Sequence, residues 1–417
     1  MRILFITAYY PPCQFGWGYM RICEQVADGL AGLGHDIAVL TSNYRDGIEY
    51  KPYPICRKLS IDPDWNLNQS AAWQFFVGRR SREKQAINHL YNLVEEFRPD
   101  IVFIWHANGL PRILLQTAEN LPGVKTVYYF ANYLPELPDE YLLYWQSAAK
   151  TGLSKLTKSF LAKIALNILA REGKPVLLKY EHSISVSDYV RRRLADQQLI
   201  GPDAAVIPNG VDLRRFAPVT RKPFSGNGKT LKCVIAGRVA PEKGIHTALK
   251  ALVHLQTQGR LQNIELTVIG DGPKAYKEKL NQIVVTSNLH KFVRFEPAVT
   301  VEKMPEILAQ YDILLLPSEW HEPLACIMLE AMASNLLVIG TTTGGSGEVL
   351  FHDRTGLVFE PGNPQSLATQ LSHILDEPNL TLRLAKTGQQ EVVEHFNIEC
   401  TIKQIEQYLL DRDKEKP

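Results

Sequence analysis

The chain has 417 residues, of which 45% are hydrophobic and 22% are charged, a composition typical of a folded globular protein large enough for two domains. The formal net charge of +2 argues against nucleic acid or a strongly acidic partner. No apolar run reaches the roughly 18 residues of a membrane span, so any membrane contact would be peripheral. The first apolar run stops at Pro11 and Pro12, which indicates a first strand rather than a cleaved leader.

The six cysteines are scattered, without a CxxC pair or any metal-ligand spacing. This pattern predicts reduced, buried thiols in a cytoplasmic protein and no structural metal site. The six are Cys13, Cys23, Cys56, Cys233, Cys326 and Cys400.

Strands alternate with helices throughout the first half, which predicts a parallel sheet. The predicted strands are 2–7, 36–40, 100–105, 125–130 and 181–186, and helices fall between them at 22–33, 83–97 and from 111. Gly16 and Gly18 in the first strand-to-helix loop would let backbone approach a ligand closely. They do not form the dinucleotide fingerprint, because Arg21 stands where its third glycine or alanine would be.

Polar residues follow two of these strands, at the sheet edge where ligands of open α/β sheets bind. His106 follows the strand at 100–105, and Asn132 follows the strand at 125–130. We expect these two side chains to be candidates for contact with a substrate.

Residues 150–179 have a strongly basic composition, with seven Lys and Arg and a single acid, Glu172. Leucine, isoleucine and phenylalanine recur there at helical spacing, so the segment predicts a basic amphipathic helix. The simpler interpretation is a surface helix packed on its own domain with a solvated lysine face. The alternative is peripheral docking onto an anionic membrane, which would suit an enzyme with lipid-linked acceptors.

A linker rich in proline, glycine and serine at 218–227 precedes a second α/β unit, with strands predicted at 232–236, 265–269, 293–295, 312–316 and 336–339. Arg238 and Lys243 lie in the loop after the first of these strands. There a forked guanidinium and an ammonium would clamp a diphosphate without a metal. Gly344 and Gly345 lie in a glycine-rich turn expected at the same sheet edge.

The stretch 314–330 reads as a buried strand, a polar turn and a helix. Pro323 suits a first helical position, so a helix is expected to open at Glu322 and Pro323 and to carry Glu330. That spacing gives about 10 Å of helix rise, which suits two carboxylates that grip the two ends of a nucleotide sugar.

Five segments together resemble family 4 of the retaining glycosyltransferases. They read VIPNGVDLRRF from 206, GRVAPEKG from 237, VIGDGP from 268, PSEWHEPLACIMLEAMA from 317 and GGSGEVL from 344. The resemblance implies an α/β protein of GT-B fold, with two Rossmann-like domains facing across a cleft. It places an acceptor-binding domain at 1–213, a nucleotide-sugar-binding domain at 214–395, and a C-terminal helix at 396–417 that crosses back onto the first domain.

The same resemblance implies roles for the residues of this chain. Glu322 would contact the transferred sugar, Glu330 would bind the ribose, and Arg238 and Lys243 would hold the donor diphosphate. Other residues expected at the donor site are Gly16, Gly18, Gly237, Leu324, Ala325, Cys326, Gly344 and Gly345. The chain departs from the family pattern at Asn132, where members often carry a histidine, so His106 is the remaining histidine candidate on that side.

The expected activity is metal-independent transfer of a sugar, with retained configuration, from a nucleoside-diphosphate sugar to an acceptor hydroxyl. The setting would be glycan, polysaccharide or glycolipid assembly, with the protein in the cytoplasm or at the inner face of the membrane. The acceptor would be a carbohydrate, a lipid-linked or a small molecule, and no cofactor beyond the donor substrate is expected. Two alternatives are a sugar-nucleotide epimerase of the same architecture and a non-catalytic partner subunit that binds a nucleotide sugar.

Overall fold

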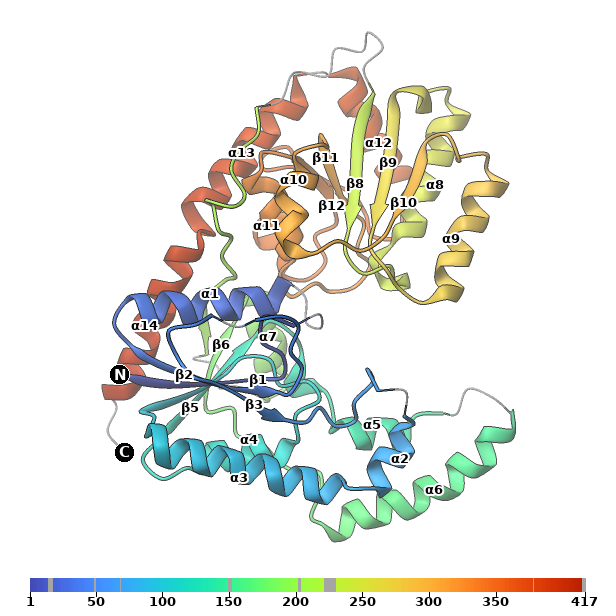
Figure 1. Cartoon of the computed structure of the whole chain (residues 1–417). Helices are drawn as coiled ribbons and strands as arrows, with labels where there is room; N and C mark the ends of the chain where they lie inside the picture. Colours follow the sequence, from blue (N-terminus) through green and yellow to red (C-terminus); the bar gives the residue numbers. More distant parts are fainter. Residues whose placement is uncertain are drawn as a thin grey trace. The chain divides into compact units, whose positions relative to one another are not determined.

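The structure is a computed structural model that describes residues 1–13, 18–48, 50–67, 69–148, 152–201, 204–220, 230–377 and 379–414. Of residues 152–155 it describes only the backbone. The chain divides into two compact units. Unit 1 holds Met1–Ile207 and Ile402–Pro417, and unit 2 holds Pro208–Thr401. Each unit contains one parallel sheet with helices on it (Figure 1), which confirms the predicted α/β class. The predicted domain boundaries at 213 and 395 stay a prediction.

Unit 1 is built on a seven-stranded sheet in the order β3-β2-β1-β4-β5-β6-β7. All its pairings are parallel, and hydrophobic residues of β1 and β4 fill its centre. The strands are β1 Arg2–Thr7, β2 Asp36–Ser42, β3 Ile55–Leu59, β4 Ile101–Ile104, β5 Lys125–Phe130, β6 His182–Ser185 and β7 Ala205–Val206.

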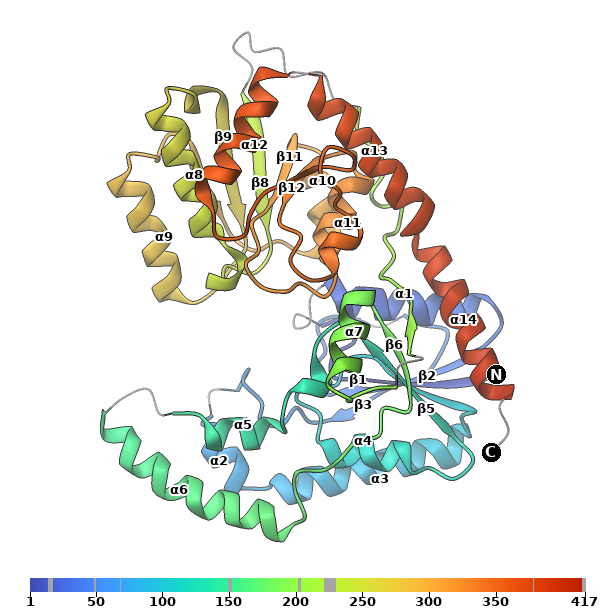
Figure 2. The same ribbon diagram turned by 180° about the vertical axis from the view of Figure 1, so that it is seen from behind.

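The helices of unit 1 cover both faces of this sheet. In Figures 1 and 2, α1 lies on one face while α3 and α4 lie on the other. Three more helices, α2, α5 and α6, lie together beside the sheet. The bounds are α1 Gly18–Gly32, α2 Ala71–Phe76, α3 Arg79–Phe97, α4 Arg112–Glu119, α5 Glu140–Gln146, α6 Gly152–Arg171 and α7 Asp188–Asp196.

Unit 2 has a six-stranded parallel sheet in the order β10-β9-β8-β11-β12-β13. Its strands are β8 Leu231–Ala236, β9 Ile264–Ile269, β10 Val293–Glu296, β11 Ile313–Leu316, β12 Leu337–Gly340 and β13 Leu357–Val358. Helix α8 contacts both α9 and α12, and α11 contacts α13. The helices are α8 Ile245–Thr257, α9 Lys274–Thr286, α10 Met304–Leu308, α11 Cys326–Ala333, α12 Pro364–Asp376, α13 Leu380–His395 and α14 Ile398–Lys414, the last continuing into unit 1 from Ile402.

The centre of the second sheet sets the position of three loops. Leu314 of β11 pairs with Val234 of β8 on one side and with Val338 of β12 on the other. Because all three strands are parallel, the loops that follow Ala236, Leu316 and Gly340 meet at one edge. The predicted donor-site residues of the second half lie in these loops or in α11.

The predicted helix start at Glu322 and Pro323 is wrong, because α11 begins at Cys326. Glu322 forms a parallel bridge with Gly344, and the chain remains non-helical through Ala325, the N-cap. A tertiary pairing therefore overrides the preference of proline for the first helical turn. Glu330 lies only one turn into the helix, so the predicted 10 Å of helix rise between the carboxylates does not apply.

The prediction of buried thiols is only partly right. All six cysteines are free, but only Cys23 and Cys233 are buried, while Cys400 is exposed.

Candidate active site

Two loops of unit 2 are joined by backbone hydrogen bonds at the strand ends. The amides of Glu319 and Trp320 both donate to the carbonyl oxygen of Glu242, at 2.9 and 3.2 Å. Gly244 follows with φ of 64°, and a Cβ there would stand 1.8 Å from the carbonyl oxygen of Pro317. Only glycine allows this approach, so the loop that carries Lys243 is fixed against the loop that carries Glu322.

Lys243 and Glu322 form an ion pair and hydrogen bond across these loops. The hydroxyl of Ser318 donates to the same carboxylate oxygen, Oε1 of Glu322, at 2.8 Å. Glu322 is buried, with 5% of its surface exposed, so its charge depends on such partners. The ammonium of Lys243 also lies 5.8 Å from the centre of the Trp320 ring. The result is a fixed carboxylate beside a cation at the strand ends.

Arg238 lies on the same loop as Lys243 but has another partner. Its guanidinium pairs with Glu242 at 2.8 Å, and 47% of its side chain is exposed. A surface pair of this kind contributes about 0 to 1 kcal/mol, so the guanidinium can turn to a stronger anion at little cost. Gly237, immediately before it, has φ of 140°, which suits glycine.

The glycine turn after β12 closes on Glu322 through the backbone. The amide of Gly345 donates to the carbonyl oxygen of Glu322 at 2.7 Å. Gly344 has φ of 70°, and a Cβ there would lie 2.2 Å from the same oxygen. The structure therefore brings Gly344 and Gly345 to the loop of Glu322, as their positions after a neighbouring strand predicted.

Helix α11 holds the second carboxylate. Burial raises the pKa of Glu330 to about 7, while the positive charge of Arg215 acts in the opposite direction. At the helix start, the side-chain amide of Asn209 donates to Sγ of Cys326 at 3.6 Å, and desolvation of this half-buried thiol raises its pKa to about 12. Leu324 and Ala325, just before it, are buried. Because α11 starts at Cys326, its unpaired amides begin there rather than at Leu324.

The corresponding edge of unit 1 is aromatic. The ring of His106 lies 6.2 Å from Tyr9 and 5.7 Å from Tyr19, centre to centre. Burial lowers the pKa of His106 to about 4, so its imidazole is neutral at pH 7. Asn132 donates from Nδ2 to Oδ1 of Asn108 at 2.8 Å.

Of the two predicted glycines of the first loop, Gly18 is the first residue of α1, whereas Gly16 lies outside the described residues.

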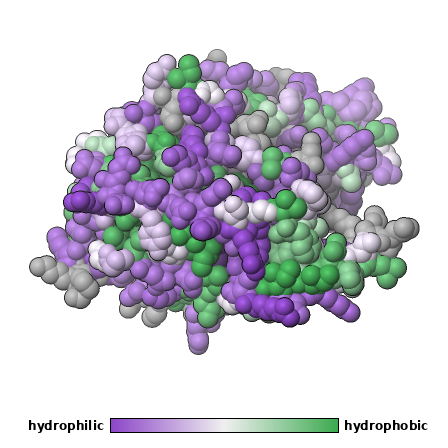
Figure 3. Space-filling view, turned by 60° about the horizontal axis from the view of Figure 1, so that its bottom comes forward, coloured by the Kyte–Doolittle hydropathy of each residue, from purple (hydrophilic) through white to green (hydrophobic). Residues whose placement is uncertain are grey.

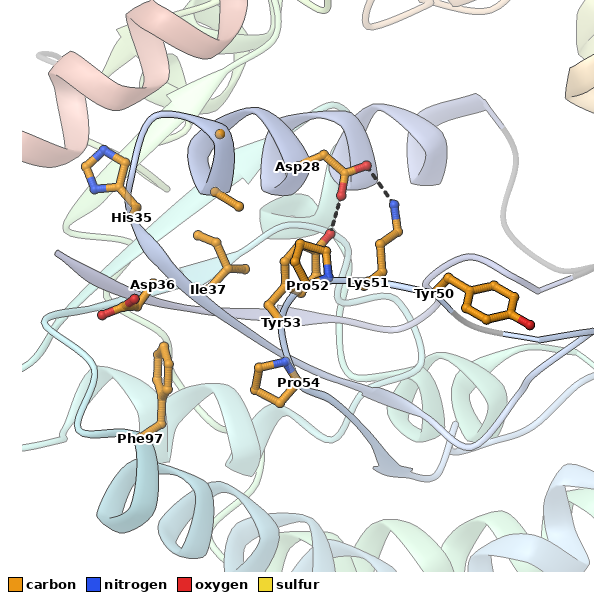
Figure 4. A pocket seen from close by; sticks show the side chains of 12 residues that line it. Asp28, His35, Asp36, Ile37, Tyr50, Lys51, Pro52, Tyr53, Pro54 and Phe97 are labelled. Atoms are coloured by element: carbon orange, nitrogen blue, oxygen red, sulfur yellow. Dashed lines mark hydrogen bonds and ion pairs between the residues drawn. The ribbon is translucent and has the colours of Figure 1, made fainter.

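A separate open cavity of about 740 Å³ lies in unit 1 beside α1 and the start of β2 (Figure 4). Within it Asp28 accepts hydrogen bonds from Lys51 and Tyr53, both at 2.6 Å. The polar groups at its centre are thus already paired with one another, and none of the predicted site residues lines it. Among the described residues, no group of three or more His, Cys, Asp and Glu side chains stands close enough to hold a metal ion.

Sequence reasoning missed several residues of this site. Glu242 was given no role, because the amides that bond to it, of Glu319 and Trp320, are distant in sequence. Ser318 was given no role although its partner Glu322 is only four residues away. Arg215 was also given no role, although its positive charge acts on Glu330. The available signal was its place in the segment VIPNGVDLRRF, which carries part of the family resemblance.

Two family models match adjoining parts of the chain. The model described as "Glycosyltransferase Family 4" matches residues 18–215, and the one described as "Glycosyl transferases group 1" matches residues 218–391. A glycogen synthase of Mycobacterium tuberculosis is 26% identical over 418 residues, covering 95% of this chain and 91% of that protein. A GDP-mannose-dependent phosphatidylinositol monomannoside mannosyltransferase of the same organism is 27% identical over 243 residues, covering 55% of this chain and 61% of that protein.

Solved structures of low sequence identity share the fold. The sucrose-phosphate synthase of Thermosynechococcus elongatus has a TM-score of 0.71 at 18% identity, covering 98% of both chains. HepE of Anabaena, solved in complex with UDP-glucose, has a TM-score of 0.68 at 18% identity, covering 99% of this chain and 100% of that one. These relatives give no support to the epimerase or to the non-catalytic subunit. The two family models together span nearly the whole chain, which therefore belongs to the family 4 glycosyltransferases, of GT-B fold, that transfer sugars in glycan biosynthesis.

Proposed function

We propose that this glycosyltransferase takes its sugar from a nucleoside-diphosphate donor, transfers it with retained anomeric configuration, and needs no divalent metal. The observation that carries the proposal is the ion pair of Lys243 with Glu322, on a loop that also presents Arg238. Two cations beside one fixed carboxylate provide both a diphosphate site and a sugar contact.

The proposed chemistry breaks the bond between the anomeric carbon and the phosphate oxygen of the donor. Negative charge grows on the leaving diphosphate, where Lys243, Arg238 and the first amides of α11 would stabilise it. The acceptor oxygen attacks the same face of the sugar, and its proton passes to the departing phosphate oxygen. No protein base is then required.

Glu322 would hold hydroxyl groups of the transferred sugar, with Ser318 keeping one of its oxygens in place. Glu330 would accept hydrogen bonds from the ribose. The backbone of six further residues would line the donor: Gly237, Leu324, Ala325, Cys326, Gly344 and Gly345.

The proposal places the acceptor in unit 1, near His106 and Asn132. Gly16 and Gly18 remain predicted contacts of the donor. The acceptor would be a carbohydrate, a lipid-linked or a small molecule. Peripheral contact of residues 150–179 with an anionic membrane at the cytoplasmic face is part of the same proposal. None of the described helices is both long and apolar enough to cross a bilayer.

The test is Arg238→Ala. One preorganised contact to the developing charge is worth ~3 to 4 kcal/mol, so turnover should fall by about two decades or more while the fold stays intact. Unchanged turnover would overturn the diphosphate assignment. Two further measurements address the finer points: activity should persist in excess EDTA, and NMR of the product should show the anomeric configuration of the donor.

A further inference from the structure

Helices α2, α5 and α6 form a small side module of unit 1 with a core of its own. Phe75 of α2 packs edge-to-face on Tyr141 and Trp145 of α5, at 5.1 and 5.5 Å. Ala165 and Leu169 of α6 complete this core. The three helices are thus held together as one body, which we call the α2–α5–α6 module.

The outer surface of this module is strongly hydrophobic. On α6, Leu156, Phe160 and Ile164 recur every four residues along one face, and they are 81%, 66% and 40% exposed. The helix packs on its unit, as the simpler interpretation predicted, but through Ala165 and Leu169 rather than through these larger side chains. Leu156, Phe160 and Ile164 therefore have solvent around them, whereas other long side chains of α6, such as Leu166 and Ile168, pack on the core of the module.

Aromatic residues extend this surface onto α2 and the loop before it. Trp73 and Phe76 lie on one face of α2 with 60% and 42% exposure, and Trp65 is 62% exposed. Trp65 contacts Tyr144 of α5, at 6.1 Å between ring centres, so the loop adjoins the module. Figure 3 shows hydrophobic side chains gathered over the part of unit 1 that carries α2 and α6.

The charge of the module is mostly positive, and Glu140, the first residue of α5, is the one acid of its three helices. The segments 65–82 and 141–171 hold three and five Lys and Arg, eight in total, and no Asp or Glu, although the whole chain has a net charge of +2. Acids from outside these segments pair with Arg79, Arg80 and Arg82. The cations of α6 include Lys163 and Arg171, which are exposed beside the hydrophobic stripe.

We infer that the outer face of the α2–α5–α6 module docks on an anionic lipid bilayer. Exposed tryptophans on a surface with an excess of lysine and arginine over acids are typical of proteins that lie in the headgroup region. A protein partner is a poorer match, because protein interfaces are depleted in lysine. Phe160 and its neighbours would enter the boundary of the acyl chains while Lys163 and Arg171 contact lipid phosphates.

This inference rests on the proposed function, and it narrows the class of acceptor that the enzyme uses. If the acceptor-binding unit is held on a bilayer, the acceptor class that it serves is a sugar or polyol carried on a lipid. A freely dissolved acceptor would give no reason for such a surface.

Co-sedimentation of the full chain with vesicles tests the inference. Phosphatidylcholine vesicles that contain phosphatidylglycerol should bind the protein at low salt. Pure phosphatidylcholine or high salt should weaken binding, because the lysine contribution is screened. Phe160→Glu and Trp73→Glu should each weaken vesicle binding about ten-fold or more. The matched control is Val285→Glu on α9 of unit 2, where the side chain is 69% exposed, and it should bind as the parent does.

Three results would overturn the inference. The first is that the parent protein fails to sediment with anionic vesicles at low salt, and the second is that Phe160→Glu binds vesicles as well as the parent does. The third is that the parent is a dimer in solution and Phe160→Glu is a monomer, because a second copy of the chain would then cover the surface. Thermal stabilisation by a nucleoside diphosphate, measured on the same proteins, tests the donor site separately, because the proposed donor site lies in unit 2. Failure of the membrane inference can therefore be told from failure of the proposed function. Phe160→Glu should leave that stabilisation unchanged.

Discussion

The two sheets end in loops of opposite chemistry. In unit 2 the strand-end loops carry charges that pair across loops, as Lys243 does with Glu322, and glycines that let backbones touch. In unit 1 the ring of His106 lies among tyrosines and Asn132 is bonded to Asn108. The charges at this edge bond to neighbours within the unit, as Arg57 does to the carbonyl oxygen of Tyr10. Charge is what a diphosphate requires, whereas rings and amides suit the hydroxyl groups of a sugar. This difference supports our proposal that unit 2 binds the donor and unit 1 the acceptor.

The largest effect should come from Lys243. Replacing it with alanine removes a cation from the proposed diphosphate site and leaves Glu322 buried without its ion-pair partner. We expect turnover to fall about a hundred-fold or more, in line with ~3 to 4 kcal/mol for one preorganised contact. The control is Lys274→Ala, which removes a lysine paired with Glu278 on α9 and should leave the rate unchanged. Equal rates for the two variants would contradict the proposal that the charged loops of unit 2 hold the donor.

Glu330 gives a pH-dependent prediction. Its pKa is raised from 4.5 to about 7 by burial, so the folded state holds this proton more tightly than the unfolded chain. This tighter binding of the proton stabilises the folded state by up to about 3 kcal/mol. The stabilisation is fully present below the pKa of the unfolded chain and is lost as pH rises through the pKa of the folded state.

Chemical denaturation of the Glu330→Gln variant tests this sign. The variant should gain stability over the parent at pH 8 and show little difference at pH 4, because the neutral amide carries no buried charge. A variant less stable than the parent at pH 8 would contradict the account of Glu330 as a desolvated carboxylate.

Gly244 tests whether the joined loops of unit 2 need close backbone contact. Gly244→Ala introduces a Cβ 1.8 Å from the carbonyl of Pro317, whereas Gly259→Ala meets nothing within 4 Å, and both positions have positive φ, 64° and 70°. Both variants should lose about 1 to 2 kcal/mol to backbone strain. Gly244→Ala should lose a further 1 to 3 kcal/mol, roughly, from the clash. Equal unfolding free energies would mean that the two loops are not held as described.

The smallest effect belongs to the acceptor side. His106→Gln replaces a neutral imidazole by another neutral polar group, and loss of a hydrogen bond costs about 0.5 to 1.5 kcal/mol. We expect KM for the acceptor to rise up to about ten-fold, with KM for the donor unchanged. A change in the donor KM alone would argue against the division of roles between the units.

Sequence reasoning recovered what short-range patterns determine. Buried apolar runs marked the strands, so the run ending at Leu316 was assigned correctly as β11. The start of α11 was missed because the bridge of Glu322 with Gly344 joins residues from different strand ends. The pairing of Lys243 with Glu322 likewise spans 79 positions, which no local spacing shows.

Helix α6 shows a different limit of sequence reasoning. Periodicity predicted an amphipathic helix, but it does not tell which apolar residues face the core. The packing uses Ala165 and Leu169 and leaves Phe160 exposed, because the partners come from α2 and α5. Only the tertiary structure distinguishes a buried stripe from a surface that is free to meet a bilayer.

The most direct measurement of the central claim is titration calorimetry of a nucleoside diphosphate with the parent protein, Lys243→Ala and Lys274→Ala. If unit 2 holds the donor diphosphate through its charged loops, Lys274→Ala should bind as the parent does. Lys243→Ala should bind about ten-fold to a hundred-fold more weakly, as expected for a lost charge-assisted contact. Binding of equal strength by all three proteins would contradict the account.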